Sequence, residues 1–129
     1  MKDPADIKSY HVHVYFDEDS IDRARAVVDA ACEAFTVERG RMHEKPVGPH
    51  PMWSCQLAMS PEVFAVLLPW MALNRDGLIV FSHPETEDFV ADHRDHAIWL
   101  GGCPPLRLEV FWRRARATVM TSCRPLPKA

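Results

Sequence analysis

The segment from Tyr10 to Phe16 constrains the fold most, because apolar and polar side chains alternate along it. Successive side chains of a β-strand point to opposite faces of a sheet, so residues two positions apart share a face. The pattern therefore predicts a strand with one face on a hydrophobic core and a second face that carries histidines. The apolar face would hold Tyr10, Val12, Val14 and Phe16, and the other face His11, His13 and Tyr15.

Hydrophobic spacing and turn residues predict the elements that follow this strand. Apolar residues recur at helical spacing over residues 21–35, and a second helix is expected over 61–74, where Ser60 would cap it. Pro69 is expected to kink this second helix or divide it in two. Three further strands are expected over residues 36–43, 52–59 and 78–83.

This order, β-α-β-β-α-β, is that of the ferredoxin-like fold, an α+β class with an antiparallel sheet and both helices on one face. We expect the first and third strands to lie side by side and parallel, with the fourth strand antiparallel to the first. After residue 85 we expect a charged, lid-like stretch with a short helix around 90–100 and a fifth strand over 106–112. The basic tail at 113–129 is expected to cross the surface or to be partly disordered.

Length, charge and cysteine spacing limit the classes of protein to which the chain can belong. A chain of 129 residues is expected to form a single domain, here with a core over residues 8–112. The net charge of −3 and the lack of a basic helix argue against nucleic-acid binding. Short apolar stretches and a polar N-terminus argue against a membrane span and favour a cytoplasmic location. The four cysteines form no CxxC pair and are expected to be reduced.

Histidine is the residue type that stands out, with seven in the chain. In the expected topology, the start of the first strand, the start of the third and the end of the fourth lie at one end of the sheet. Each histidine taken alone is more often a solvated side chain, but together they predict a metal site, because neutral imidazole is a common metal ligand. The histidines that this topology gathers are His11, His13, His50 and His83.

Several short motifs resemble the DOPA 4,5-dioxygenase family in order and spacing across about residues 8–112. The more specific ones are Gly48-Pro49-His50-Pro51 and His83-Pro84 followed by Trp99-Leu100-Gly101, whereas the His-x-His of the first strand is weak alone. The resemblance implies a ferredoxin-like dimer, a dimeric α/β barrel, and Fe(II)-dependent extradiol opening of a catechol ring with O₂. DOPA itself does not transfer with the fold, so the identity of the catechol stays open.

The resemblance and the chemistry of ring opening together suggest roles for single residues. The expected Fe(II) ligands are His13, His50 and His83. His11 would be the base that deprotonates the catechol, and His93, which shares a helical face with His96, would donate a proton later. The expected substrate contacts are Arg75, Gln56 and Trp99, although Arg75 also suits a helix C-terminus and Trp99 the packing of the lid. The usual ligand set includes a carboxylate, so Glu44 and Glu109 remain candidates, while His43 is expected at the surface.

Three other interpretations of the sequence remain open. The main one is a non-catalytic module of the same fold that binds a metal or a small molecule. The others are a cofactor-free dimeric-barrel monooxygenase or isomerase, and a structural oligomer with a buried histidine cluster. A homodimer is expected of the enzyme, because Ile79 and Phe81 share the open face with the histidines, and a mixed face of this kind is seldom left bare.

Overall fold

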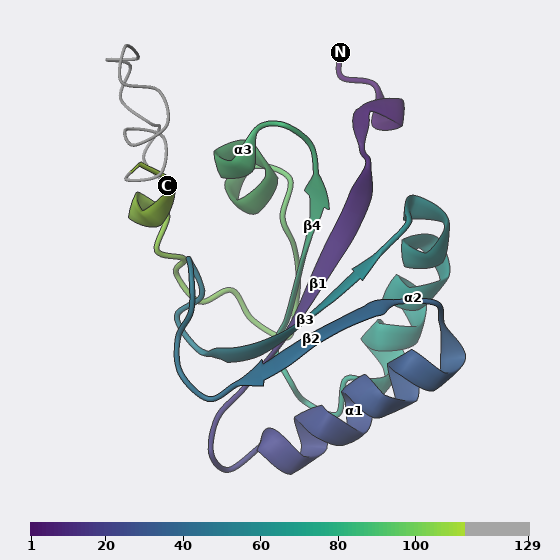
Figure 1. The fold of residues 1–129 in the computed structure, drawn as a ribbon, viewed down its shortest axis with the longest axis vertical. Coiled ribbons are helices and arrows are strands. Elements are labelled where there is room, and N and C mark those ends of the chain that lie inside the picture. The colour runs from purple at the N-terminus through teal and green to yellow at the C-terminus, as the bar shows by residue number, and fades with distance from the viewer. Residues whose placement is uncertain (113–129) are drawn as a thin grey trace.

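A five-stranded sheet with two helices on one face forms the body of the structure, a computed structural model that describes residues 1–112 (Figure 1). The expected basic tail at 113–129 lies outside the described residues. The α+β, ferredoxin-like fold expected from the sequence is confirmed. Its elements follow in the order η1 (Pro4–Asp6, a 3-10 helix), β1 (Ser9–Phe16), α1 (Ile21–Ala34), β2 (Glu38–His43), β3 (Trp53–Met59), α2 (Pro61–Asn74), β4 (Val80–Glu85), α3 (Phe89–Arg94) and β5 (Ile98–Leu100).

The strand order across the sheet is β2-β3-β1-β4-β5, and each neighbouring pair is antiparallel. The expectation that the first and third strands run parallel is therefore wrong. The connection through α1 returns the chain to its starting end, so β2 runs in the direction of β1, and the turn into β3 then reverses the chain. Phe16 at the end of β1 consequently lies opposite Trp53 at the start of β3.

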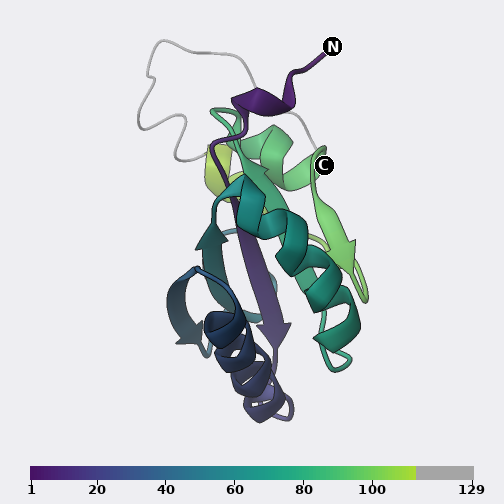
Figure 2. The same cartoon turned by 90° about the vertical axis from the view of Figure 1, so that its right-hand side faces the viewer.

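The hydrophobic core lies between the sheet and the helices α1 and α2, which cover the same face in both ribbon views (Figures 1 and 2). The alternation of β1 is satisfied there, because Val12 and Val14 are fully buried in this core. Each such side chain contributes about 1.5–3 kcal/mol to stability when it leaves water. The other fully buried core residues are Cys55, Leu57 and Val80 from the sheet and Ala24, Val28, Ala31, Leu67 and Met71 from the helices.

Helix α2 begins at a well-formed cap and continues past its internal proline. The Ser60 hydroxyl accepts a hydrogen bond from the backbone N–H of Val63 at 3.2 Å, as is typical of an N-cap. The expected division of the helix at Pro69 does not occur. Leu67 and Met71 on either side of it are both fully buried in the core, which holds the two halves against the sheet. Within residues 1–112, no helix combines the length and the apolar character that a membrane span requires.

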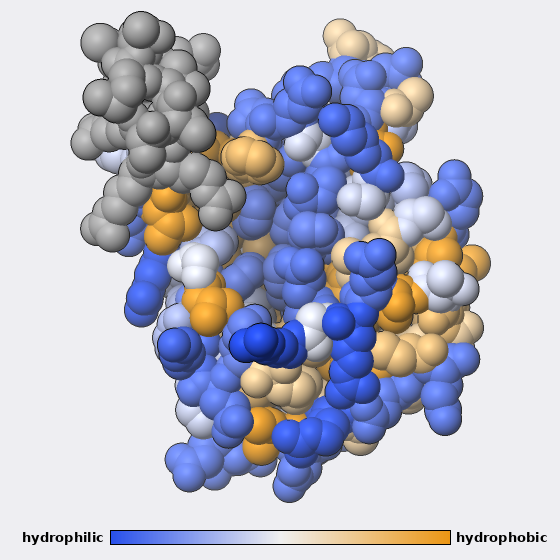
Figure 3. Space-filling model, viewed as in Figure 1, coloured by the Kyte–Doolittle hydropathy of each residue, from blue (hydrophilic) through white to orange (hydrophobic). Residues whose placement is uncertain are grey.

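Hydrophilic residues cover most of the molecular face seen in Figure 3, where apolar residues appear as small, separate patches. Among the large apolar side chains that are exposed, Val66 and Leu73 belong to α2. Three of the cysteines, Cys32, Cys55 and Cys103, lie in the described part of the chain and are free thiols, as expected. The packing of residues 1–112 therefore rests on the apolar core, and none of these three cysteines forms a disulfide there.

The chain after β4 differs from the prediction. The helix expected around 90–100 is shorter and is followed by an edge strand, β5, whose Trp99 pairs with Phe81 of β4. The strand expected over 106–112 is wrong, because residues 109–112 are helical. Leu108 and Phe111 are spaced three apart and pack with Val90 of α3 in a second, small apolar cluster. Their helical spacing was obscured because Leu106, Leu108 and Val110 also alternate as in a strand.

Candidate functional site

Strands β1 and β4 present three histidines on the face of the sheet that α1 and α2 leave open. In the antiparallel register, His11 lies directly opposite His83, and His13 lies opposite Phe81. Directly opposed residues point to the same face, and so do residues two apart along one strand. The pairing of two strands therefore gathers His11, His13 and His83 around a common point.

The three side chains approach one another closely. One ring nitrogen of each lies within 4.8 Å of a ring nitrogen of the other two, and Nε2 of His13 is 3.1 Å from Nε2 of His83. His13 and His83 are buried, and the side chain of His11 is about one-quarter exposed. We call these three residues the histidine triad. It is open to solvent only on the side of His11, a geometry that suits three ligands of one metal ion.

Burial keeps the histidines of this site in their neutral form. It lowers the pKa of His83 to about 3, and it lowers the pKa of His13 well below its ordinary value, with neighbouring histidines adding to the effect. Burial also lowers the pKa of His11, with a further contribution from His93. A neutral imidazole has one nitrogen lone pair free, which is the form that binds a metal. The donor set therefore fits a divalent transition-metal ion.

The outer nitrogens of two triad rings face a carboxylate and a carbonyl oxygen. Nδ1 of His83 lies 3.0 Å from the Pro84 carbonyl oxygen and 3.4 Å from Oε1 of Glu85. The same carboxylate oxygen lies 3.0 Å from Nδ1 of His11. Since neither oxygen partner of His83 can donate a hydrogen bond when Glu85 is ionised, His83 donates from Nδ1 and its Nε2 offers a lone pair to the centre of the triad.

The sequence contained a signal for Glu85 that was missed. Glu85 follows His83 by two positions on the same strand, so the period-2 rule places it on the face of the triad. Burial and the nearby Asp92 raise the pKa of the Glu85 carboxyl group. The carboxylates proposed from the sequence, Glu44 and Glu109, are both exposed, and neither belongs to the triad.

His50 joins the site from the loop between β2 and β3. Its ring centroid is 4.1 Å from that of His13, and its Nδ1 is 2.8 Å from the Tyr15 hydroxyl. Burial lowers the pKa of His50 to about 4 and raises that of Tyr15. The expected convergence of His50 with the triad is thus present, but the reason given for it is wrong. The antiparallel β3 starts at the far end of β1, beside Phe16, and the loop brings His50 back along the open face.

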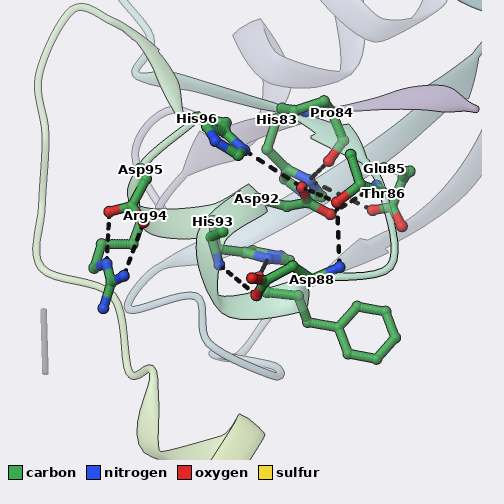
Figure 4. Close-up of polar contacts among 12 residues, drawn as sticks. His83, Pro84, Glu85, Thr86, Asp88, Asp92, His93, Arg94, Asp95 and His96 are labelled. Atoms are coloured by element: carbon green, nitrogen blue, oxygen red, sulfur yellow. Dashed lines mark hydrogen bonds and ion pairs between the residues drawn. The ribbon is translucent and has the colours of Figure 1, made fainter. Parts of the chain in front are cut away.

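Helix α3 places His93 beside His83 of the triad, and both are labelled in the close-up in Figure 4. The ring of His93 lies 3.9 Å from that of His83, measured between centroids, and its Nδ1 is 2.7 Å from the carbonyl oxygen of Phe89. His93 therefore donates from Nδ1, and its Nε2 carries the lone pair of the neutral ring. Its expected helical partner, His96, lies beyond the end of α3 and contacts Asp92 at 3.7 Å.

The residues expected to contact substrate divide into two groups. Gln56 lies opposite His13 across β1 and β3, and Trp99 stacks on Phe81 with ring centroids 4.3 Å apart, so both belong to the histidine face. Arg75 instead lies at the C-cap of α2, where it donates to the Leu78 carbonyl oxygen at 2.9 Å. It packs so closely on Gly101 that a Cβ there would come within 2.5 Å of its guanidinium. These contacts suit the helix C-terminus that the sequence offered as the alternative.

A separate cavity of about 860 Å³ lies beside the N-terminal segment and the end of β4. Its lining includes Lys2, Lys8, Tyr10, Thr86 and His96, and none of the triad histidines. Charges of both signs border the cavity, so its lining favours neither an anionic nor a cationic ligand. The chemistry of the site therefore rests on the histidine face.

Comparisons with known proteins point to one family. The model of the Dopa 4,5-dioxygenase family matches residues 10–110. A DOPA 4,5-dioxygenase from Amanita muscaria is 26% identical over 113 residues, covering 81% of this chain and 50% of that protein. An uncharacterised 21.2 kDa protein from Botryotinia fuckeliana is 37% identical over 81 residues, covering 57% of this chain and 44% of that protein. The chain thus spans about half the length of these curated relatives.

One solved structure resembles this fold over nearly the whole length of that structure. It is the crystal structure of "a putative dioxygenase" from Nostoc punctiforme PCC 73102, which superimposes with a TM-score of 0.87 at 40% sequence identity. The match covers 88% of this chain and 99% of that chain. The similarity therefore includes most of this chain and almost all of that structure.

Proposed function

The chain belongs to the Dopa 4,5-dioxygenase family, and on this premise we propose that it is an Fe(II)-dependent extradiol dioxygenase that opens the ring of a catechol with O₂. In that reaction both oxygen atoms enter the product, and the ring bond beside the two hydroxyl-bearing carbons breaks, so no external reductant is needed. The observation that carries the proposal is the approach of three neutral histidines to within 4.8 Å on the open face of the sheet.

We assign the metal to the histidine triad of His11, His13 and His83. The sequence suggested His50 as the third ligand and His11 as the base, but the geometry favours exchanging these two. His11 lies opposite His83 across the strand pair, and its ring nitrogen is one of three that lie within 4.8 Å of one another, a group that His50 does not join in the described part of the chain. Three protein nitrogens would leave coordination positions of Fe(II) open for both catechol oxygens and O₂.

His50 and His93 flank the triad and are proposed to move protons to and from the substrate. Each is neutral at pH 7, because burial lowers its pKa, and each holds one ring nitrogen in a hydrogen bond that fixes the ring. The second nitrogen of each ring is available to a proton on a catechol hydroxyl. General acid–base groups of this type typically contribute about 10²–10⁴-fold to rate.

Aromatic side chains beside the triad suit the ring of a catechol. Trp99 and Phe81 form a stacked pair, and the Trp99 ring lies 6.0 Å from that of Tyr15, between centroids. Gln56 adds an amide on the same face. We propose that Trp99 and Gln56 contact the substrate and that Arg75 supports the end of α2. The substrate class is a dihydroxyphenyl compound, DOPA or a relative of it.

A homodimer is part of the proposal. Gln56 and Trp99 are only half-buried on the open face, so a second copy could cover this face and enclose the site in a dimeric α/β barrel. Light scattering at micromolar concentration would measure the mass in solution. A monomer under those conditions would remove the dimer from the proposal and leave the metal chemistry untouched.

Oxygen uptake tests the proposed activity most directly. The protein would be loaded with Fe(II) without air and then mixed with a panel of catechols and air-saturated buffer. We expect O₂ consumption and a ring-opened product that carries both atoms of isotopically labelled O₂. Stoichiometric Fe(II) binding without uptake for any catechol would instead favour the non-catalytic binding module. Turnover that does not depend on added Fe(II) would favour the cofactor-free oxygenase.

A further inference from the structure

A single carboxylate oxygen lies close to Nδ1 of two of the triad histidines. Oε1 of Glu85 is 3.0 Å from Nδ1 of His11 and 3.4 Å from Nδ1 of His83. The Glu85 side chain is only 22% exposed, so the surrounding protein atoms restrict its position.

The backbone fixes Glu85 on both sides. Its carbonyl oxygen accepts a hydrogen bond from the N–H of Lys8 at 3.0 Å, across the pair of strands β1 and β4. The next residue, Thr86, is bound by the buried Asp92 through its backbone N–H at 2.8 Å and its hydroxyl at 2.7 Å (Figure 4). These hydrogen bonds hold the backbone at Glu85 in place, as is required of a residue that orients other side chains.

We infer that Glu85 is a positioning residue for the metal: its carboxylate accepts hydrogen bonds from Nδ1 of His11 and His83, so that both rings offer Nε2 to the ion. The inference rests on the proposed metal site and deepens it. A ligating histidine generally donates its other ring N–H to a carboxylate or carbonyl oxygen, which sets the tautomer and raises the basicity of the ligating nitrogen. His83 has both kinds of acceptor, whereas Glu85 is the acceptor that the structure gives to His11.

The role of Glu85 differs from that of a ligand. Its oxygen faces Nδ1, and the Nε2 atoms of His13 and His83 meet 3.1 Å apart. A carboxylate on the Nδ1 side acts through the rings, and loss of such a partner typically costs about 10–100-fold in metal affinity. Glu85→Gln keeps the size of the side chain but removes its charge and turns one of its two acceptors into a donor.

The test measures metal affinity in the full chain by competition between the protein and a chelator, with Co(II) or Fe(II) under anaerobic conditions. Glu85→Gln and Glu85→Ala should each weaken binding about 10–100-fold, and Glu85→Asp should fall between them and the parent. Glu87→Gln is the matched control, because Glu87 is two positions away, 91% exposed and paired with Lys8 at 3.5 Å on the surface. It should bind like the parent.

Two further measurements separate positioning from other roles. The absorption spectrum of Co(II) bound at saturation should keep the parent's shape in Glu85→Gln, and a spectrum that shows a lost ligand would overturn the inference. The metal-free variant should melt close to the metal-free parent, so that weaker binding is not a sign of unfolding. Equal affinity of Glu85→Gln and parent would refute the role of Glu85 alone. A parent that binds neither ion would refute the proposed metal site as well.

Discussion

The Tyr15 hydroxyl lies 2.8 Å from Nδ1 of His50, which joins the central strand of the sheet to the loop between β2 and β3. Both groups are buried, and burial raises the pKa of Tyr15, so the phenol is neutral at pH 7. We therefore expect the hydroxyl to hold the His50 ring in one orientation beside His13, from which it is 4.1 Å distant between centroids.

Tyr15→Phe tests this contact. Removal of the hydroxyl leaves the buried Nδ1 of His50 without its partner, so unfolding free energy should fall by about 1–3 kcal/mol. If His50 moves protons, turnover should fall as well, while metal content stays at the parent level. Urea unfolding, oxygen uptake and metal analysis on one preparation measure all three. Unchanged stability together with unchanged turnover would mean that the hydrogen bond has no part in either.

Alanine substitutions test the assignment of the metal ligands. His11→Ala, His13→Ala and His83→Ala should each abolish Fe(II) binding or weaken it severely, because each removes one of three converging nitrogens. His50→Ala should retain the metal and lose about 10²–10⁴-fold in turnover. His43→Ala is the matched control, since His43 lies in β2 outside the triad. Loss of metal in His50→Ala with retention in His11→Ala would restore the ligand set expected from the sequence.

Stability of the metal-free protein should fall in acid. The folded-state pKa is about 4 for His50 and about 3 for His83, against 6.5 for an unperturbed histidine. Below pH 6.5 the unfolded chain therefore binds more protons than the folded chain, and acidification favours unfolding. Each group should contribute up to about 1.4 kcal/mol per pH unit, and the contribution ends near its folded-state pKa. Urea titrations from pH 7 to pH 4 measure the slope, which a flat profile would contradict.

Metal binding should stabilise the fold and a chelator should reverse the effect. An ion that binds only the folded chain adds about 2.7 kcal/mol at a free concentration of 100 times its Kd. The midpoint of thermal unfolding should therefore rise with added Fe(II) or Zn(II) in the parent. It should stay constant in His13→Ala, which lacks a central ligand. Equal shifts in the two proteins would indicate that the ion binds elsewhere.

Asp92→Asn tests the attachment of α3 to β4. Asp92 is 1% exposed and accepts hydrogen bonds from the Thr86 N–H and hydroxyl. An amide is uncharged and has one acceptor oxygen, so at least one of these charge-assisted hydrogen bonds is replaced by a weaker one, and the free energy of unfolding should fall by about 1–3 kcal/mol. Asp95→Asn is the control, because Asp95 is half-exposed and pairs with Arg94 at the surface. A free energy of unfolding that changes equally in both variants would contradict the structural role of Asp92.

The histidine face of β1 could be predicted because period-2 alternation depends on local geometry alone. The direction of β3 could not be read from alternation, since a strand shows the same pattern in either direction, and the error followed from this. The period-2 rule that placed His13 on the open face applies to Glu85 as well. Glu85 was missed because a charged residue after a proline was interpreted as the start of a loop. The helical turn after residue 108 could not be predicted from the sequence. Leu106, Leu108 and Val110 alternate as in a strand, whereas Leu108 and Phe111 pack together with helical spacing.

The opposition of His11 and His83 has a consequence for how the chain reaches its working form. If β1 paired with β4 one residue out of step, its two faces would exchange, and the histidines would turn into the apolar layer while Val12 turned out to water. A shift by two would restore the faces but place His13, rather than His11, across from His83. The arrangement of the triad described here therefore requires the observed alignment of β1 and β4. The amount of metal ion bound by a refolded sample would therefore measure the fraction of molecules in which β1 and β4 are correctly aligned.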